Sequence, residues 1–477
     1  MTLVAGVDSS TQSVKVDVCD ADTGEVVRSA RASHPDGTEV SAAAWLDAYR
    51  EATADPGLLA GVEAISVGGQ QHGMVTLDAD GELVRDALLW NDNRSAGAAR
   101  DLIDDLGGAQ AWADAAGAVP VASFTASKIR WLARNEPESA ARVRRVVLPH
   151  DYLTWEIGGR SFEPVTDRGD ASGTAYFDAV TNTYRDDLVE LAFGRPLELP
   201  RVAAPDEVVG ETPEGLKIAA GTGDNMASTL GMVVPDRTAL ISLGTSGVAC
   251  LRSQTQTHDP SGVVAGFADA TGAFLPLVCT LNGARNLVAM AKALNVSLDE
   301  FSELAVSAPA GSEGLVFLPY LEGERAPLWD PRARGAFAGL DSAQGRAHLL
   351  RAVLEGVACS VRHLLHTAEA LAGTEAVELR VAGGGSRLAL WNQIKADVTG
   401  RRVRPCVTSE NGVLGGAMLA AIGAGVFADV TAAGEAMVQL LEPVLPDAET
   451  AETYDRLFER YVALYPRLKD LPAAAGA

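Results

Sequence analysis

The sequence predicts an α/β fold made of two related domains, and three observations support this prediction. Two short turns rich in Gly, Ser and Thr, at residues 5–13 and 241–247, each join an apolar strand-like run to a second apolar run. Strand and helix patterns alternate between and after these turns, as in α/β proteins. At 477 residues the chain is too long for one comfortable core, and its length favours two to three domains. We place the domains at residues 1–235 and 236–477.

The two turns carry almost no side-chain bulk, so their backbone N–H groups and hydroxyls can close around an anion. The first contains Ser9, Ser10 and Thr11, and the second contains Gly244 and Thr245. One such turn in each half suggests a nucleotide held between two related domains.

The first half of the chain alternates strand and helix signals. Strands are predicted at 14–18, 64–67 and 216–220, and helices at 42–52, 96–106 and 125–135. The strand at 216–220 leads through a Gly-Thr-Gly turn into a further helix. The intervening stretches are turn-rich (167–184) or proline-spaced and extended (196–214).

The second half begins near Pro235 without a low-complexity linker, which favours a hinge between packed domains. Apolar residues at helical spacing predict a long helix over 343–371. A strand at 377–381 ends in Gly383-Gly384-Gly385. The Gly- and Ala-rich stretch 413–422 predicts a helix that packs closely against its neighbours.

Composition and charge narrow the class of protein. The net charge of −24 makes nucleic acid and anionic membranes poor partners, and the basic run Arg401–Arg404 is best interpreted as a solvated strand edge. We expect no membrane span, and a cytoplasmic location because the N-terminus lacks a signal-peptide pattern. Five scattered cysteines and seven dispersed histidines disfavour disulfides and a structural metal. The chain also lacks the P-loop, protein-kinase and dinucleotide-binding signatures.

Two carboxylates follow strands at places suited to chemistry. Asp8 precedes the first turn, where it can hold a magnesium ion while turn amides take phosphates; the alternative is an aspartate that merely forms its turn. Asp224 follows a buried-looking strand and precedes a helix, at the edge where α/β proteins place their sites. Its alternative is a helix N-cap.

Two loops offer groups that suit a polyol. His72 lies among glycines and amides in Gly69-Gln70-Gln71-His72-Gly73, although a lone loop histidine is more often solvated. The loop Trp90-Asn91-Asp92 with Arg94 combines a planar ring, a carboxylate and a guanidinium, and the alternative is a structural salt bridge.

Taken together, these residues resemble the FGGY family of carbohydrate kinases, within the superfamily of sugar kinases, actin and heat-shock chaperone ATPases, and most closely its xylulose-specific branch. The resemblance covers essentially the whole chain in order. The motifs that carry it are Gly6-Val7-Asp8-Ser9-Ser10-Thr11 with Lys15, Gly69-Gln70-Gln71-His72-Gly73, Leu89-Trp90-Asn91-Asp92, Phe124-Thr125-Ala126-Ser127-Lys128, Leu148-Pro149-His150-Asp151-Tyr152, Asp170-Ala171-Ser172-Gly173-Thr174, Gly223-Asp224-Asn225, Leu243-Gly244-Thr245-Ser246-Gly247, Leu321-Glu322-Gly323-Glu324-Arg325-Ala326-Pro327 and Gly383-Gly384-Gly385-Ser386.

The resemblance implies a role for each matched position. It implies two actin-like (ribonuclease H-like) α/β domains with a cleft between them, the N-terminal domain binding sugar and the C-terminal domain binding nucleotide. Asp224 is then the proton acceptor, with an ordinary aspartate pKa, and Asp8 the carboxylate on the metal and phosphate side. The sugar would be met by Gln71, His72, Asn225, Trp90 and Asp92, and the nucleotide by Ser9, Ser10, Thr11, Gly244, Thr245, Gly384 and Gly385.

The implied activity is ATP- and Mg²⁺-dependent phosphorylation of a pentulose, D-xylulose first, at its terminal hydroxyl. Gln71 stands where the family's xylulose-specific members commonly have Met, which leaves ribulose, gluconate or a polyol as alternative acceptors. An ATP-driven actin-like or chaperone-like interaction protein is an alternative from another class, as is a silent sugar sensor. A homodimer is open.

Overall fold

The computed structural model describes residues 1–408 and 410–470, and the chain divides into two compact units. Unit 1 comprises Met1–Val233, Gln254–Leu275 and Glu410–Gln439. Unit 2 comprises Val234–Ser253, Pro276–Ser409 and Leu440–Ala477. Each unit therefore combines segments that are far apart in the sequence.

Unit 1 is built on a mixed sheet with strand order β13-β14-β5-β1-β2-β3, in which β15 also pairs with β5. β1 runs antiparallel to β2 and parallel to β5. The strands of this unit are β1 (Leu3–Ser9), β2 (Ser13–Asp20), β3 (Val26–Ser33), β4 (Glu39–Val40), β5 (Val62–Gly69), β6 (Val75–Leu77), β7 (Ala87–Leu88), β8 (Arg145–Val147), β9 (Val165–Asp167), β10 (Phe177–Asp178), β11 (Thr183–Tyr184), β12 (Arg201–Ala203), β13 (Val208–Glu211), β14 (Lys217–Ala219), β15 (Thr222–Gly223) and β18 (Ala265–Ala268).

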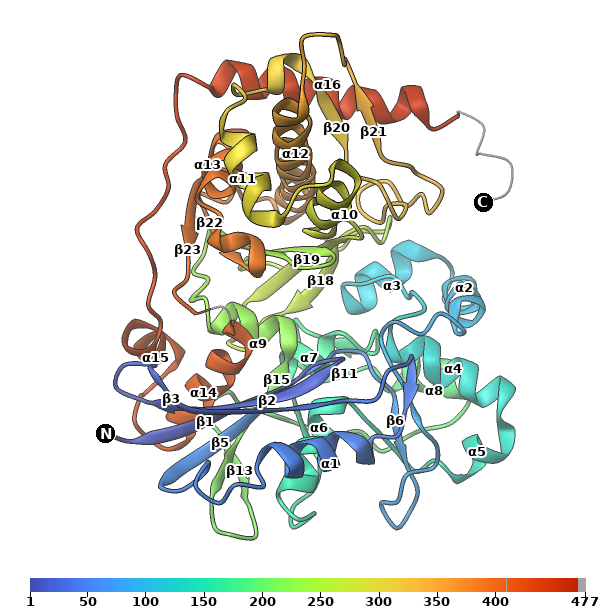
Figure 1. Ribbon diagram of the computed structural model, residues 1–477. Helices are drawn as coiled ribbons and strands as arrows, with labels where there is room; N and C mark the ends of the chain where they lie inside the picture. Colours follow the sequence, from blue (N-terminus) through green and yellow to red (C-terminus); the bar gives the residue numbers. More distant parts are fainter. Residues whose placement is uncertain (409, 471–477) are drawn as a thin grey trace. The chain divides into compact units, whose positions relative to one another are not determined.

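Helices cover both faces of this sheet (Figure 1), with α1 and α6 on one face and α9 and α14 on the other. The buried valines of β1 and β2 and the apolar face of α1, including Trp45 and Tyr49, form the core beneath them. The helices of unit 1 are α1 (Ala43–Ala52), α2 (Ala96–Asp105), α3 (Ala109–Ala116), α4 (Thr125–Asn135), α5 (Pro137–Arg142), α6 (Pro149–Ile157), α7 (Arg168–Ser172), α8 (Asp186–Phe193), α9 (Asp224–Leu230), α14 (Asn411–Gly423) and α15 (Val430–Met437).

Glycines let α14 pack closely on its neighbours, as its small residues predict. A Cβ atom at Gly415 would lie 1.9 Å from the carbonyl oxygen of Ala227 in α9, and one at Gly6 in β1 would lie 2.0 Å from the carbonyl oxygen of Val413. Any side chain at either position would collide with backbone atoms. These glycines therefore set the distance between α14, α9 and the sheet that carries Asp8.

Unit 2 contains strands β19, β17, β16, β22 and β23, which lie side by side in that order. The elements of this unit, and the strand β19 that enters it, are β16 (Thr238–Leu243), β17 (Gly247–Leu251), β19 (Phe274–Thr280), β20 (Val316–Leu318), β21 (Ala336–Ala338), β22 (Glu378–Ala382), β23 (Arg402–Pro405), α10 (Arg285–Leu294), α11 (Leu298–Val306), α12 (Arg346–Ala372), α13 (Ala389–Thr399), α16 (Ala451–Leu468) and the short 3₁₀ turns at Ser312–Gly314 and Gly384–Arg387.

The predicted secondary structure agrees closely with the observed elements. The long helix predicted at 343–371 is α12, which ends where Gly373 adopts a left-handed conformation with φ 62°. Both predicted turns join antiparallel strands, β1 to β2 and β16 to β17. Within residues 1–408 and 410–470, none of the helices combines the length and the apolar character that crossing a bilayer requires.

Candidate active site

The turn between β1 and β2 holds the first group of predicted residues. Ser10 bonds across it, with its backbone N–H and its hydroxyl 3.1 and 3.2 Å from the Ser13 carbonyl oxygen. The indole N–H of Trp90 donates to the Thr11 hydroxyl at 2.9 Å. The structure thus brings Trp90 to the proposed phosphate turn.

Asp8 lies near the end of β1 with Lys15 opposite it on β2. Its Oδ1 atom is buried and has no hydrogen-bond partner among the described residues. Burial raises the pKa of Asp8 to about 6, and the charges of Glu410 and Asp17 add to this while Lys15 opposes it. Lys15 itself is ion-paired with Glu410. A buried carboxylate oxygen without a donor suits a hard cation.

Asp224 and Asn225 begin α9 immediately after β15, which runs parallel to β5 with Gly223 opposite Gly69. Since the carboxyl ends of parallel strands meet at one edge of a sheet, the residues after β5 and after β15 emerge together. Asn225 donates to Oδ1 of Asp224 from its backbone N–H at 2.7 Å and from its side-chain amide at 3.0 Å. Both hydrogen bonds that the described residues make to the Asp224 carboxylate go to Oδ1, and neither goes to Oδ2.

The pKa of Asp224 differs from the ordinary aspartate value that we expected. Burial raises it to about 8, and the negative charges of Asp8 and Asp170 raise it further than the hydrogen bonds from Asn225 lower it. The sequence places Asp8 and Asp170 far from residue 224, so this effect could not be predicted from local pattern. A carboxylate with a raised pKa is a better proton acceptor near neutral pH than an ordinary one.

Gln71 belongs to the same hydrogen-bonded group. Its Oε1 atom accepts from the side-chain amide of Asn225 at 2.9 Å, so its Nε2 group points elsewhere as a donor. This Nε2 atom is buried and has no partner among the described residues, and the same holds for both amide atoms of Gln70. Gly223 makes the close approach possible, because a Cβ there would lie 2.7 Å from Cγ of Gln71.

His72 follows in a left-handed conformation with φ 68°. Its Nδ1 atom lies 2.7 Å from the Gly173 carbonyl oxygen, so Nδ1 carries the proton and Nε2 is left as an acceptor. Burial, with the nearby Lys128 charge, lowers its pKa to about 3, which keeps the ring neutral. The ring packs against Phe124 and Phe267, whose rings also contact each other, so the three rings form a triangle.

Lys128, which belongs to the Phe124–Lys128 motif, supports His72 directly. Its ammonium is fully buried and donates to the His72 carbonyl oxygen at 3.1 Å and to the carbonyl oxygen of Ser123. Burial lowers the pKa of Lys128 to about 7. The sequence around Lys128 does not indicate that its ammonium is buried, because the His72 carbonyl oxygen that it contacts comes from another segment.

Both carboxylate oxygens of Asp92 accept hydrogen bonds from neighbouring side chains. Arg94 binds both of its oxygens, and the Thr38 hydroxyl donates to Oδ2 at 2.8 Å. These bonds match the structural salt bridge that the sequence left open. A contact between Asp92 and a sugar stays a prediction.

The second turn, in unit 2, is exposed at Gly244, Thr245 and Ser246. The segment that leads into α10 braces it from one side: the backbone N–H of Ala284 donates to the Gly244 carbonyl oxygen at 2.7 Å, and the Arg285 side chain donates to that of Thr245 at 3.1 Å. Its own amides and hydroxyls therefore sit at the surface of a fixed loop.

The glycine run after β22 forms a tight 3₁₀ turn beside β16. Gly383 has φ 84°, and a Cβ there would lie 2.6 Å from the Leu243 carbonyl oxygen. Gly385 is packed against Trp391, whereas Gly384 is exposed and has open space where a Cβ would be. The second turn and the glycine run are thus adjacent in unit 2.

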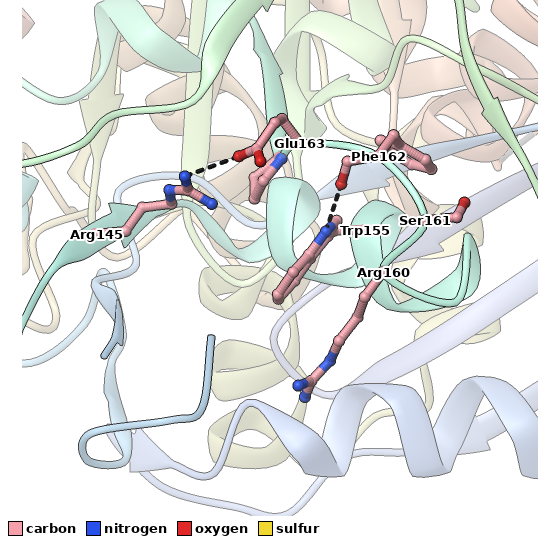
Figure 2. A pocket seen from close by; sticks show the side chains of 7 residues that line it. Arg145, Trp155, Arg160, Ser161, Phe162 and Glu163 are labelled. Carbon is pink, nitrogen blue, oxygen red and sulfur yellow. Dashed lines mark hydrogen bonds and ion pairs between the residues drawn. The ribbon is translucent and has the colours of Figure 1, made fainter. Parts of the chain in front are cut away.

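A cavity of about 340 Å³ lies elsewhere in unit 1 and contains none of the predicted site residues. Figure 2 shows Arg145 paired with Glu163, and the Trp155 ring N–H donating to the Phe162 carbonyl oxygen. Arg160 is also paired, with Glu82 and Glu156. With its arginines neutralised, this cavity offers no obvious charge for a ligand.

Comparison with known proteins identifies the relatives of this chain. Residues 3–231 match the N-terminal domain of the FGGY family of carbohydrate kinases, and residues 239–424 match the C-terminal domain of that family. A xylulose kinase of Streptomyces coelicolor is 43% identical over 432 residues, which are 88% of this chain and 87% of that protein.

Solved structures agree with this match. The structure of a xylulose kinase from Bifidobacterium adolescentis has a TM-score of 0.84 at 38% identity and covers 95% of this chain and 99% of that chain. A gluconate kinase from Lactobacillus acidophilus has a TM-score of 0.89 at 26% identity and covers 98% of each chain. The predicted two-domain sugar kinase fold is confirmed.

Proposed function

This chain belongs to the FGGY family of carbohydrate kinases, and we propose that it phosphorylates a pentulose, D-xylulose first, with ATP as the phosphate donor. The product would be D-xylulose 5-phosphate. The relatives named xylulose kinase support this acceptor, and the group formed by Asp224, Asn225 and Gln71 carries the proposal.

Asp224 is the proposed proton acceptor. Because Asn225 holds Oδ1 from two sides, Oδ2 is the atom left to accept the proton of the attacking hydroxyl. Phosphoryl transfer needs little covalent help, so the main work of the chain is to orient that hydroxyl and to exclude water. Burial, the largest cause of the raised pKa of Asp224, suits the uptake of this proton as transfer proceeds.

Gln71 and His72 are the proposed sugar contacts. Nε2 of Gln71 can donate to a substrate oxygen, while Nε2 of His72 can accept from a hydroxyl. This pair of opposite polarities fits a compound that carries both a carbonyl and hydroxyls. Asn225, the third predicted sugar contact from this group, also orients Asp224 and Gln71 through its hydrogen bonds.

The phosphate side is proposed to use residues of both turns. Amides and hydroxyls at Ser9, Ser10 and Thr11 in unit 1, and at Gly244 and Thr245 in unit 2, suit phosphate oxygens. Gly384 and Gly385 are proposed to line the adenosine pocket. The buried Oδ1 atom of Asp8, which no described residue bonds, fits Mg²⁺, and the ion when bound would supply positive charge that neutralises phosphate oxygens.

A second acceptor class has one specific observation in its favour. Gln71 replaces the Met common in xylulose-specific members, and a buried amide donor also suits a carboxylate such as that of gluconate. A coupled assay of ADP release with D-xylulose, D-ribulose, gluconate, xylitol and glycerol separates the two. Highest kcat/KM on D-xylulose supports the proposal, and highest kcat/KM on gluconate contradicts it.

The role of Asp224 is tested by Asp224→Asn, which keeps the size of the side chain. We expect kcat to fall by about 10²–10⁴-fold, the range for loss of a general base. Calorimetry with an ATP analogue should show nucleotide binding unchanged. Turnover near that of the parent chain would contradict the assignment.

Sedimentation of the parent chain tests whether it forms the homodimer that stays a prediction.

A further inference from the structure

Unit 1 contains a buried group of one histidine and three aspartates, none of which has been assigned a contact with sugar, nucleotide or metal above. His150 and Asp151 lie at the start of α6, Asp167 caps the N-terminus of α7, and Asp170 lies within α7. All four side chains are at most 3% exposed. We call these four residues the His150 cluster.

Both ring nitrogens of His150 face carboxylates. Nδ1 lies 2.6 Å from Oδ2 of Asp170, and Nε2 lies 3.3 Å from Oδ1 of Asp151. A neutral imidazole has one N–H, so one of its nitrogens would face a carboxylate oxygen with no proton between them. An imidazolium donates to Asp170 through Nδ1 and places a second N–H 3.3 Å from Oδ1 of Asp151, a buried atom that accepts no hydrogen bond from the described residues.

The electrostatic surroundings agree with a charged ring. The charges of Asp151, Asp170 and Asp167 outweigh burial and raise the pKa of His150 to about 9. Burial, together with the charges of Asp151 and Asp170, raises the pKa values of Tyr176 and Tyr184 above the ordinary value, so both side chains stay uncharged.

His150 is also in contact with the two segments that carry the proposed sugar-side residues. A Cβ at Gly69, which ends β5 just before Gln70 and Gln71, would lie 2.8 Å from Cβ of His150. A Cβ at Gly221, three residues before Asp224, would lie 2.7 Å from Cδ2 of His150. The backbones of both segments therefore rest on this ring and its main chain.

Helix α7 extends these contacts to the other side of the site. Asp167 accepts a 2.9 Å hydrogen bond from the hydroxyl of Thr222, two residues before Asp224. Gly173, which follows α7, accepts from Nδ1 of His72 at 2.7 Å. A shift of α7 would thus move both the start of α9 and the ring of His72.

We propose that His150 is a positioning residue: as an imidazolium bound to Asp170 and Asp151, it fixes α7 and thereby the placement of Asp224, Gln71 and His72. The inference rests on the proposed function, because it assigns the cluster to that same site. The positive charge is the operative property, since it holds two carboxylates that would otherwise repel each other in a buried place.

The test compares His150→Gln, which keeps hydrogen bonding without charge, with His150→Lys, which keeps a cation. His150→Gln should lower kcat for the sugar by about 10–100-fold, as expected for a small misplacement of reacting groups, with ATP affinity unchanged. His150→Lys, which keeps the positive charge, should have a kcat much closer to the parent value than His150→Gln has. Leu46→Ala, on the buried face of α1, is the stability control and should lower the unfolding temperature while leaving kcat near the parent value.

A measurement independent of activity uses ¹⁵N-histidine NMR of the parent chain, with the His150 resonances assigned by their absence in His150→Gln. Two protonated ring nitrogens at pH 7.5 support the proposal, and a neutral ring overturns it. Equal activity of His150→Gln and the parent, or equal loss in the Gln and Lys variants, also overturns it. So does one divalent metal ion per purified chain that is missing from His150→Gln. If the parent phosphorylates no sugar, the proposed function fails and with it the role of His150, even where NMR shows an imidazolium.

Discussion

Asn225 holds Oδ1 of Asp224 with both of its amide groups, at 2.7 and 3.0 Å, and its side chain also reaches Oε1 of Gln71 at 2.9 Å. One side chain therefore orients the proposed proton acceptor and a proposed sugar contact together. This double use makes Asn225 a sensitive place to test the site.

Asn225→Ala should lower kcat/KM for the sugar by about 10–100-fold, because a hydrogen bond to a charged group contributes about 1.5–3 kcal/mol. The backbone N–H to Asp224 remains, so activity should persist at a reduced level. Asn135→Ala, which removes an exposed amide bonded to the Trp131 carbonyl oxygen, is the matched control and should leave kinetics unchanged. Equal kinetics for both variants would refute the coupling.

Gln71→Met should change the choice of acceptor. The variant removes the one amide donor that the Asn225 contact leaves free, so an acceptor oxygen in a buried place loses about 1–3 kcal/mol of interaction. We expect kcat/KM on the preferred sugar to fall by about 5–150-fold. The ratio of kcat/KM between the preferred sugar and the other acceptors should decrease as well. Steady-state kinetics on the five-compound panel measures this, with Gln110→Met on the exposed face of α3 as control. An unchanged ratio would show that Gln71 does not select the substrate.

Gly384→Ala and Gly385→Ala should behave differently although the residues are neighbours. A Cβ at Gly385 would lie 2.2 Å from the Trp391 ring, so that variant should lower the unfolding temperature. A Cβ at Gly384 meets nothing within 4 Å, so Gly384→Ala should keep its stability and weaken ATP binding by filling space proposed for adenosine. Calorimetric unfolding and ATP titration distinguish these effects. Unchanged ATP affinity in Gly384→Ala would remove Gly384 from the proposed pocket.

Lys128 should make stability depend on pH. Its pKa is lowered to about 7 in the folded chain and returns to an ordinary value near 10.5 on unfolding, so the unfolded chain binds more protons between these values. The penalty for this buried charge is full below pH 7 and is relieved as pH rises. The free energy of unfolding of the parent, relative to Lys128→Met, should rise by about 1.4 kcal/mol per pH unit above pH 7.

Denaturant unfolding at several pH values between 6 and 9.5 checks this slope. Lys292→Met, which changes an exposed lysine, is the control. The difference in free energy of unfolding between the parent and Lys292→Met should not change with pH. If the difference between the parent and Lys128→Met is also independent of pH, then the pKa of Lys128 is not lowered in the folded chain.

Much of the site could be predicted from local sequence. Gly, Ser and Thr between two apolar runs predict the β1–β2 and β16–β17 turns, because few other residue patterns let a backbone turn so closely. Asp224 at the junction of a strand and a helix was also recognisable, since that position faces a sheet edge whatever the partners are. The roles of Lys128 and Asn225 were not, because their partners come from other elements.

The sequence by itself determined the α/β class, the order of strands and helices, the two turns and the family, since these depend on local pattern and on motifs in register. Only the tertiary structure decided how the side chains meet. It placed Asp8 and Asp170 near Asp224, left Nε2 of Gln71 without a partner among the described residues and enclosed His150 between aspartates. The physical reason is that pKa values and hydrogen-bond partners depend on distances through space. Residues 150 and 170, or 71 and 225, carry no record of those distances in their spacing along the chain.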